Sequence, residues 1–132
     1  MIDTNSEELA YFFADLARFP VPTAQEERTL IAAAQAGNSQ ARDEFLSRNM
    51  LLVVNIACKF GNQGIEMADL IQVGSLGLMK ALDKFDAGAG TRFSTYATYW
   101  VRQAISRYID EHHLIVRVKS ELIWRQKSEM TG

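Results

Sequence analysis

Aromatic, amide and guanidinium side chains share one face of a helix predicted in the C-terminal third of the chain. Tyr96, Trp100, Gln103 and Arg107 recur at spacings of three and four residues, and Tyr99 stands beside Trp100. Aromatic rings stack on unpaired bases, an amide pairs with a base edge, and a guanidinium neutralises phosphate. The pattern therefore favours contact with single-stranded or opened DNA over reading of an intact major groove.

Core packing is the alternative interpretation of Tyr96, Tyr99 and Trp100, because aromatic residues at helical spacing are usually buried. Two features favour the DNA interpretation. The aromatics are crowded against Gln103 and Arg107, and the same helix already has a separate apolar stripe. That stripe consists of Ala97, Val101, Ala104, Ile105 and Tyr108.

The rest of the chain predicts an all-α, compact domain of five to six helices. Apolar residues recur every three or four positions, and the only prolines, Pro20 and Pro22, fall in one short break. Thr23 with Glu26 forms a capping box, and Gly37 is a left-handed cap. We expect helices over residues 6–18, 23–36, 39–60, 67–85 and 95–111, with Ser94 as the cap of the last of these. An extended or irregular stretch over 114–118 and a helix from Ser120 should follow.

Two glycines, Gly74 and Gly77, lie inside the helix predicted over residues 67–85. Each costs about 1 kcal/mol relative to alanine in a helix. Close approach of a neighbouring helix accounts for this cost, and a simple kink is the alternative.

Composition predicts one soluble, cytoplasmic domain. The 132 residues are 48% apolar and 23% charged, which is typical of a globular chain, and no apolar run is long enough to cross a membrane. The single cysteine, Cys58, excludes an internal disulfide and fits a reducing compartment. Net charge is −2 overall, yet residues 92–132 carry seven basic and four acidic side chains. The C-terminal third is therefore mildly basic within an acidic protein.

No constellation in the sequence predicts an enzyme. The phosphate-loop pattern is absent, and no nucleophile is paired with a base. His112 and His113 are adjacent and lack zinc-ligand spacing, so we interpret them as a frayed helix end. We expect no catalytic residue, metal or cofactor.

Residues 45–118 resemble region 2 of the bacterial sigma-70 family of RNA polymerase initiation factors. The matching stretches are NMLLVVNIA at 49–57, DLIQVGSLGLMKALDKF at 69–85, RFSTYATYWVRQAI at 92–105 and IVRV at 115–118. The stretches PTAQEE at 22–27 and AGNSQAR at 36–42 look like the preceding region 1.2. The resemblance implies a region 1.2-like helical segment over 1–38 and a region 2 core over 39–118. Residues 119–132 would then be the start of a region 3-like helix or a tail.

This resemblance implies two partners, core RNA polymerase and promoter DNA, and no membrane. Region 2 docks on the clamp helices of the polymerase β′ subunit, and it captures the non-template strand of the promoter −10 element as the DNA opens. The docking face carries over to Asp69, Gln72, Ser75 and Met79. Promoter opening is expected to require core polymerase.

The resemblance also assigns the DNA-binding residues. Tyr96 and Phe85 match the pocket for the flipped −11 adenine, and Tyr99 with Trp100 matches the aromatic pair at the upstream edge of the bubble. Gln103 and Ser106 match positions near the first −10 base pair, while Arg107 matches a phosphate contact. The remaining matches are Arg92 and the pocket for the −7 thymine, which comprises Asn49, Leu52, Ser94 and Thr95.

Several positions depart from the family pattern. Tyr99 replaces the first tryptophan of the commonest pair, and Val73 and Ser75 replace a usual acid and asparagine. Residues 87–89 and 91 lack the aromatic and basic side chains that are common there, and Lys119 replaces a proline. The sequence ends at Gly132 without region 3 or 4, as expected either for an excised fragment or for a minimal sigma factor. A second polypeptide that supplies region 4, or an anti-sigma factor, is a further conceivable partner.

Three rival interpretations remain. A polymerase-binding co-sigma subunit or sigma antagonist would keep the face from Asp69 to Met79 without needing Tyr96, Trp100 and Gln103. A duplex-reading helical protein would bind intact DNA without polymerase, which the weak basic charge disfavours. An enzyme is disfavoured by the missing catalytic patterns.

Overall fold

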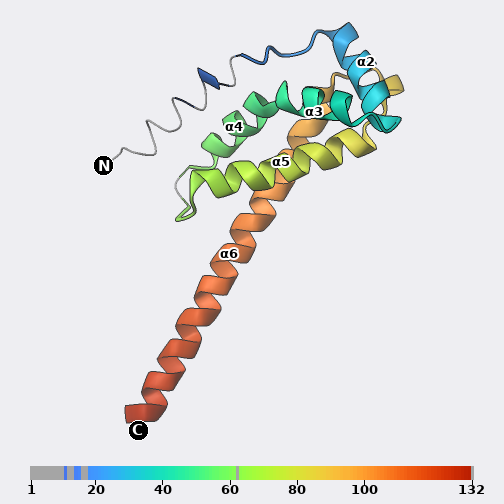
Figure 1. Ribbon diagram of the computed structural model, residues 1–132. Helices are drawn as coiled ribbons and strands as arrows, with labels where there is room; N and C mark the ends of the chain where they lie inside the picture. The colour runs from blue at the N-terminus through green and yellow to red at the C-terminus, as the bar shows by residue number, and fades with distance from the viewer. Residues whose placement is uncertain (1–10, 12–13, 16–17, 62, 132) are drawn as a thin grey trace.

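The computed structural model describes residues 11, 14–15, 18–61 and 63–131, and this part of the chain is all-helical. Figure 1 shows the order of the helices along the chain. They are α2 (Ala24–Gln35), α3 (Ser39–Ser47), α4 (Met50–Lys59), α5 (Met67–Lys84), the short 3₁₀ helix η1 (Ala87–Ala89) and α6 (Phe93–Thr131). The helix predicted over 6–18 lies mostly outside the described residues.

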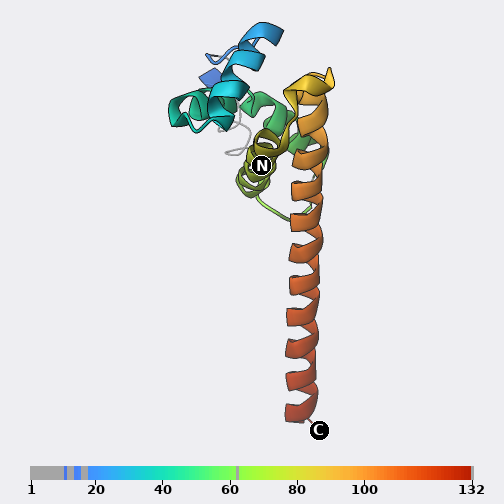
Figure 2. The ribbon, with the colours of Figure 1, turned by 90° about the vertical axis from the view of Figure 1, so that its right-hand side faces the viewer.

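The helices form a small bundle from which α6 projects. The α2 and α3 helices pack on each other, α4 lies against α5 and α6, and α5 makes its most extensive contact with α6. In Figures 1 and 2 the first part of α6 lies in the bundle, while its second part extends away from every other helix. None of the described helices combines the length and apolarity that a membrane crossing requires.

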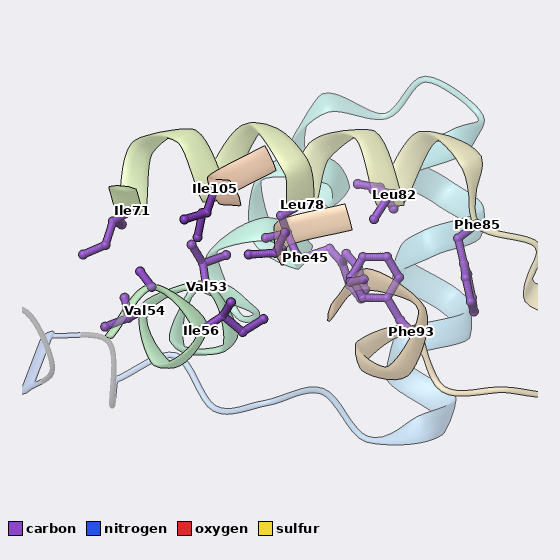
Figure 3. Close-up of a cluster of buried hydrophobic side chains, with 14 of the residues drawn as sticks. Phe45, Val53, Val54, Ile56, Ile71, Leu78, Leu82, Phe85, Phe93 and Ile105 are labelled. Carbon is purple, nitrogen blue, oxygen red and sulfur yellow. The ribbon is translucent and has the colours of Figure 1, made fainter. Parts of the chain in front are cut away.

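The core forms where apolar stripes from four helices meet. Phe45 of α3, Val53 of α4, Leu78 of α5 and Phe93 of α6 are fully buried. Figure 3 shows these side chains pointing toward one another between the helices. A fully buried side chain of this size contributes about 1.5–3 kcal/mol relative to an exposed one. The apolar stripes, with Phe93 as a core residue that the predicted stripe did not include, therefore hold α5 and the start of α6 in place.

The two helical glycines mark close contacts of α5. A Cβ atom on Gly77 would lie 2.6 Å from the backbone oxygen of Trp100, and one on Gly74 would lie 2.7 Å from Cγ1 of Val53. The expected close approach is confirmed, since no larger residue fits at these separations without movement. Gly77 fixes the distance between α5 and the part of α6 that carries Trp100.

The predicted boundaries of α2 are confirmed. The Thr23 hydroxyl accepts from the Glu26 backbone N–H at 3.1 Å, and a Glu26 carboxylate oxygen accepts from the Thr23 N–H at 3.0 Å. Gly37 follows the helix with φ of 105°, in the left-handed region that favours glycine.

The single helix predicted over 39–60 is wrong, because α3 and α4 are separated at Arg48 and Asn49. Asn49 leaves the helical region with φ of −116° and ψ of 6°, and its side-chain amide donates to the Phe45 carbonyl oxygen at 2.9 Å. Asparagine competes with the backbone in this way, which disfavours a continuous helix.

The prediction for the C-terminal third is also wrong, because α6 runs without a break from Phe93 to Thr131. No proline or glycine occurs between Gly90 and Gly132 to interrupt it, and isolated β-branched residues cost only tenths of a kcal/mol in a helix. Ser94 lies inside α6 rather than at its cap. His112 and His113 lie within the helix rather than at a frayed end, and Nε2 of His113 is 3.0 Å from the Gln63 carbonyl oxygen.

Candidate nucleic-acid interface

Four aromatic rings form a continuous series from the end of α5 onto α6. The centroid of Tyr96 lies 5.3 Å from that of Phe85 and 6.1 Å from that of Trp100, and Trp100 lies 5.6 Å from Tyr99. We call Phe85, Tyr96, Trp100 and Tyr99 the aromatic row. These separations are those of interacting aromatic pairs, so the structure brings together the aromatic residues singled out by the sequence.

The aromatic row passes from the core to the surface. Phe85 is buried and meets the buried ring of Phe93 edge-on at 5.4 Å. Tyr96 and Trp100 are half-buried, and Tyr99 is 61% exposed. The Tyr96 hydroxyl donates to the Lys84 carbonyl oxygen at 3.4 Å. The row therefore combines a fixed inner end with accessible π-surface.

Lys80 adds a positive charge that sequence reasoning did not assign to this site. Its Nζ lies 5.6 Å from the centroid of the Trp100 ring, within the range of a cation–π contact. Lys80 belongs to α5, and only the packing of α5 on α6 brings it to the aromatic row. Spacing along one helix carries no signal of such a contact.

The polar candidates on α6 are more accessible than the inner rings. Gln103 and Arg107 are exposed, and Ser106 is half-buried. Nε of Arg107 lies 3.5 Å from Glu111, in an exposed ion pair of the kind worth about 1 kcal/mol or less. The guanidinium can therefore exchange Glu111 for another anion at small cost.

The residues assigned to the thymine pocket differ in accessibility. Asn49 is buried, and its amide is already bonded to Phe45. Leu52 is half-buried, whereas Ser94 and Thr95 are exposed in the first turn of α6. Asn49 thus faces inward, unlike the two hydroxyl-bearing residues.

Glu27 is a second residue that sequence reasoning missed. It is buried, its Oε2 accepts from the Phe93 backbone N–H at 2.9 Å, and its Oε1 lies 3.2 Å from Nη2 of Arg92. A hollow of about 120 Å³ beside it is also lined by Phe85 and Arg92. The sequence pattern identified Glu26 through the capping box of α2. It contains no signal that Glu27, the next residue, would be buried against α6.

A second candidate surface follows the outer side of α5. Asp69, Gln72 and Met79 are exposed there, as expected. The Ser75 hydroxyl instead donates to the Ile71 carbonyl oxygen at 2.9 Å and lies 3.5 Å from Sδ of Met50, so it turns toward α4. Leu76, which sequence reasoning missed, is 60% exposed between Gln72 and Met79. Its spacing of four residues from Gln72 and three from Met79 is the signal that could have assigned it to this surface.

Among the described residues, no three His, Cys, Asp or Glu side chains are grouped closely enough to hold a metal ion. The geometry at both surfaces consists of rings, amides, charges and one exposed aliphatic side chain. Such surfaces bind through stacking, ion pairing and burial.

Comparison with known proteins identifies relatives of this fold. The family model described as Sigma-70 region 2 matches residues 45–113. RNA polymerase sigma factor SigA4 of Synechococcus elongatus is 38% identical over 135 residues, which cover 86% of this chain and 43% of the relative. Sigma factor SigA of Listeria monocytogenes is 37% identical over 118 residues, with 89% and 32% coverage. SigA of Lactococcus lactis subsp. cremoris is 39% identical over 115 residues, with 85% and 32% coverage. The chain therefore spans between about a third and less than half of the length of these relatives.

Proposed function

This chain belongs to the sigma-70 family, and from that premise we propose that it acts in transcription initiation as a sigma region 2. In this role it binds core RNA polymerase and captures non-template bases of the promoter −10 element. The observation that carries the proposal is the aromatic row, which is anchored in the core at Phe85 and exposed at Tyr99.

Base capture exchanges one stacking partner for another. Unpairing and unstacking a base costs a few kcal/mol, and stacking on an aromatic side chain returns about 1–3 kcal/mol. Tyr96 is held by Phe85 and by its hydrogen bond to Lys84, so little side-chain entropy is lost when a base stacks on it. We assign the flipped −11 adenine to Tyr96 and Phe85.

The outer end of the aromatic row is proposed to meet the upstream edge of the bubble. Trp100 supplies the large ring, and Tyr99 supplies a smaller, exposed ring with a polar tip. Lys80 lies beside Trp100 and adds positive charge where phosphates would pass. Gln103 and Ser106 are assigned to the first −10 base pair, and Arg107 and Arg92 to phosphate contacts.

A second pocket, for the −7 thymine, is proposed at Asn49, Leu52, Ser94 and Thr95. Ser94 and Thr95 present exposed hydroxyls. Asn49 is buried and one N–H of its side-chain amide is bonded to the Phe45 carbonyl oxygen, which leaves its second N–H and its side-chain oxygen to meet a base. Ser94 and Thr95 are therefore expected to contribute more of the contacts to the thymine than Asn49 does.

The outer surface of α5 is proposed to dock on the clamp helices of the polymerase β′ subunit. Asp69 and Gln72 supply polar contacts, and Met79 packs adaptably. Leu76 joins this set as an exposed apolar side chain at its centre. We assign Ser75 to the edge of this surface, because its hydroxyl already donates to the Ile71 carbonyl oxygen and lies beside Met50 of α4. The whole cycle makes and breaks no covalent bond, so it involves no catalytic residue or cofactor.

A native gel with a labelled non-template −10 oligonucleotide tests the proposal. The chain alone, core polymerase alone and their mixture are compared, with a scrambled oligonucleotide as the control. We expect a shifted complex only in the mixture and only with the −10 sequence. Association with polymerase without an oligonucleotide shift would support a co-sigma subunit or antagonist instead. Failure to associate with polymerase would refute both roles.

A further inference from the structure

We propose that Glu27 is a positioning residue whose buried carboxylate, supplied by α2, caps the first turn of α6 and so holds the aromatic row in place. This inference rests on the proposed function in one respect only, namely that the aromatic row binds promoter bases. The capping role itself concerns two helices of this chain and can be tested without DNA.

Both carboxylate oxygens of Glu27 have bonding partners. One oxygen accepts from the Phe93 backbone N–H at 2.9 Å, and the other lies 3.2 Å from Nε and from Nη2 of Arg92. The residue is only 7% exposed. Burial of a carboxylate is costly unless it is bonded and paired, and these partners are the first residue of α6 and the residue directly before it. Both oxygens of the Glu27 carboxylate are therefore bonded at the N-terminus of α6.

The start of α6 needs such an acceptor. The first four backbone N–H groups of a helix have no partner within it. A negative charge near this end is stabilised by the positive end of the helix dipole. Ser94, the local residue best suited to cap, already lies inside α6, where its carbonyl oxygen accepts from the Thr98 hydroxyl. A glutamate 66 positions earlier in the chain supplies the acceptor for Phe93.

The capped turn is also the turn that anchors the aromatic row. The Phe93 side chain is fully buried, and its ring meets Phe45 at 4.8 Å and Phe85 at 5.4 Å. Tyr96 follows Phe93 by three residues and packs on the same Phe85 ring. Fraying of the first turn would release Phe93 and disturb the Phe85–Tyr96 pair. Glu27 thus acts on the row through the backbone N–H of Phe93.

The test compares Glu27→Ala and Glu27→Gln with Glu26→Gln as the matched control. Glu26 is the adjacent residue on α2, but it is bonded to Thr23 and Arg48 rather than to α6. Three quantities are measured where all variants are folded: hydrogen exchange at the Phe93 amide, Trp100 fluorescence in a Trp124→Phe background, and oligonucleotide affinity with core polymerase. The first two report on the capped turn and on the aromatic row directly.

We expect Glu27→Ala to raise exchange at Phe93 about tenfold and to weaken oligonucleotide binding by a similar factor, as expected for loss of a charged helix cap. Glu27→Gln retains an acceptor oxygen and should recover part of both effects, while Glu26→Gln should change neither. If Glu27→Ala does not fold, the glutamine variant carries the comparison.

Unchanged Phe93 exchange and Trp100 emission in a folded Glu27 variant would overturn the positioning role. Loss of oligonucleotide affinity with no change at α6 would also overturn it, because Glu27 would then act through Arg92 or on DNA directly. If the unsubstituted chain fails to bind the oligonucleotide with polymerase, the proposed function fails, but exchange and fluorescence still decide whether Glu27 caps α6.

Discussion

Tyr96 packs against Phe85 and donates its hydroxyl to the Lys84 carbonyl oxygen, yet it stays half-buried rather than enclosed. Its neighbour Tyr99 is largely exposed and meets Trp100 edge-on, with an angle of 84° between the rings. At the scale of single residues, the molecule therefore separates a fixed aromatic surface from a free one. The fixed ring is suited to holding a base, and the free ring is suited to the edge of a duplex.

Replacing the Tyr96 ring tests the fixed surface. Tyr96→Ala should weaken binding of the −10 oligonucleotide with polymerase by about 1–3 kcal/mol, because one stacking contact is lost. Tyr96→Phe should keep most of the affinity, and Tyr11→Ala, at a tyrosine that is 80% exposed, should keep all of it. Fluorescence anisotropy measures these affinities. Equal affinity of Tyr96→Ala and the unsubstituted chain would contradict the base-capture role.

Leu76 tests the proposed polymerase surface. Leu76→Ser should lower the affinity for core polymerase at least about tenfold, since burial of one leucine contributes about 1.5–3 kcal/mol and each 1.4 kcal/mol is a factor of about ten. The control is Leu122→Ser, at a similarly exposed leucine on the projecting part of α6. Both variants should melt like the unsubstituted chain, because surface substitutions usually change stability by less than about 0.5 kcal/mol. Calorimetric titration into polymerase that shows no difference between the two variants would exclude Leu76 from the interface.

The pKa of Glu26 lies below the usual glutamate value, mainly because the carboxylate accepts from the Thr23 backbone N–H and secondly because it is bonded to Arg48. A lowered folded-state pKa stabilises the protein at pH values above the unfolded-state pKa. The contribution is lost as pH falls through the folded-state value. Glu26→Gln should therefore be less stable than the unsubstituted chain at pH 6, with the gap closing in acid. Urea titrations across this range measure it, and a gap independent of pH would contradict the role of the charge.

At the scale of helices, α5 fixes the position of the proposed polymerase surface relative to the aromatic row. Gly77 faces α6 at the Trp100 backbone, while Gln72, Leu76 and Met79 face outward. The side of α5 proposed to meet polymerase is thus backed by the helix that carries the aromatic row. Close packing of the two helices transmits any movement of α5 to α6.

Alanine substitutions should separate the two glycine contacts. Gly77→Ala should destabilise the fold by about 1–3 kcal/mol, because its Cβ would meet the Trp100 backbone oxygen and overpacked sites cost this much. Gly74→Ala should also destabilise the fold but should cost less, because its Cβ would meet a methyl group of the buried Val53 side chain rather than backbone, and alanine favours the helix. Chemical unfolding gives both values, and the reverse order would contradict the packing described here.

The sequence predicted helices where apolar periodicity and capping residues agree, as in α2 and α5. It failed at Asn49, where a side-chain bond to Phe45 replaces a helical one, and over 114–118, where an extended or irregular stretch was expected and α6 continues. It grouped Tyr96, Tyr99 and Trp100 because they share one helix. It could not predict Lys80 or Glu27 at the site, because both reach α6 only through tertiary packing.

At the scale of the whole molecule, the second part of α6 is a free-standing helix. His113 still meets the Gln63 carbonyl oxygen, but residues 114–129 beyond it are all exposed, and Figures 1 and 2 show this part of α6 leading away from the bundle. Its apolar side chains include Leu114, Val118 and Leu122, on one side of the helix. The stability of the bundle therefore does not depend on this segment.

Lys119→Pro tests this independence. Proline inside a helix removes a backbone hydrogen bond and costs about 3 kcal/mol locally, so α6 should kink or break before residue 119. The thermal midpoint of the bundle should not change. Spin labels on the exposed Cys58 and on a Gln126→Cys variant should report an altered, broader distance distribution, with Lys119→Ala as the control. A lowered thermal midpoint for the proline variant would show that the segment supports the bundle.

The length of α6 also governs how the free molecule diffuses. Its 39 residues span about 58 Å at 1.5 Å per residue, whereas a globular chain of 132 residues has a radius of gyration of about 14 Å. The protein should therefore tumble anisotropically, scatter X-rays as an elongated particle and leave a sizing column ahead of globular standards of its mass. Elution volume alone will make a monomer resemble a dimer, and light scattering gives its true mass.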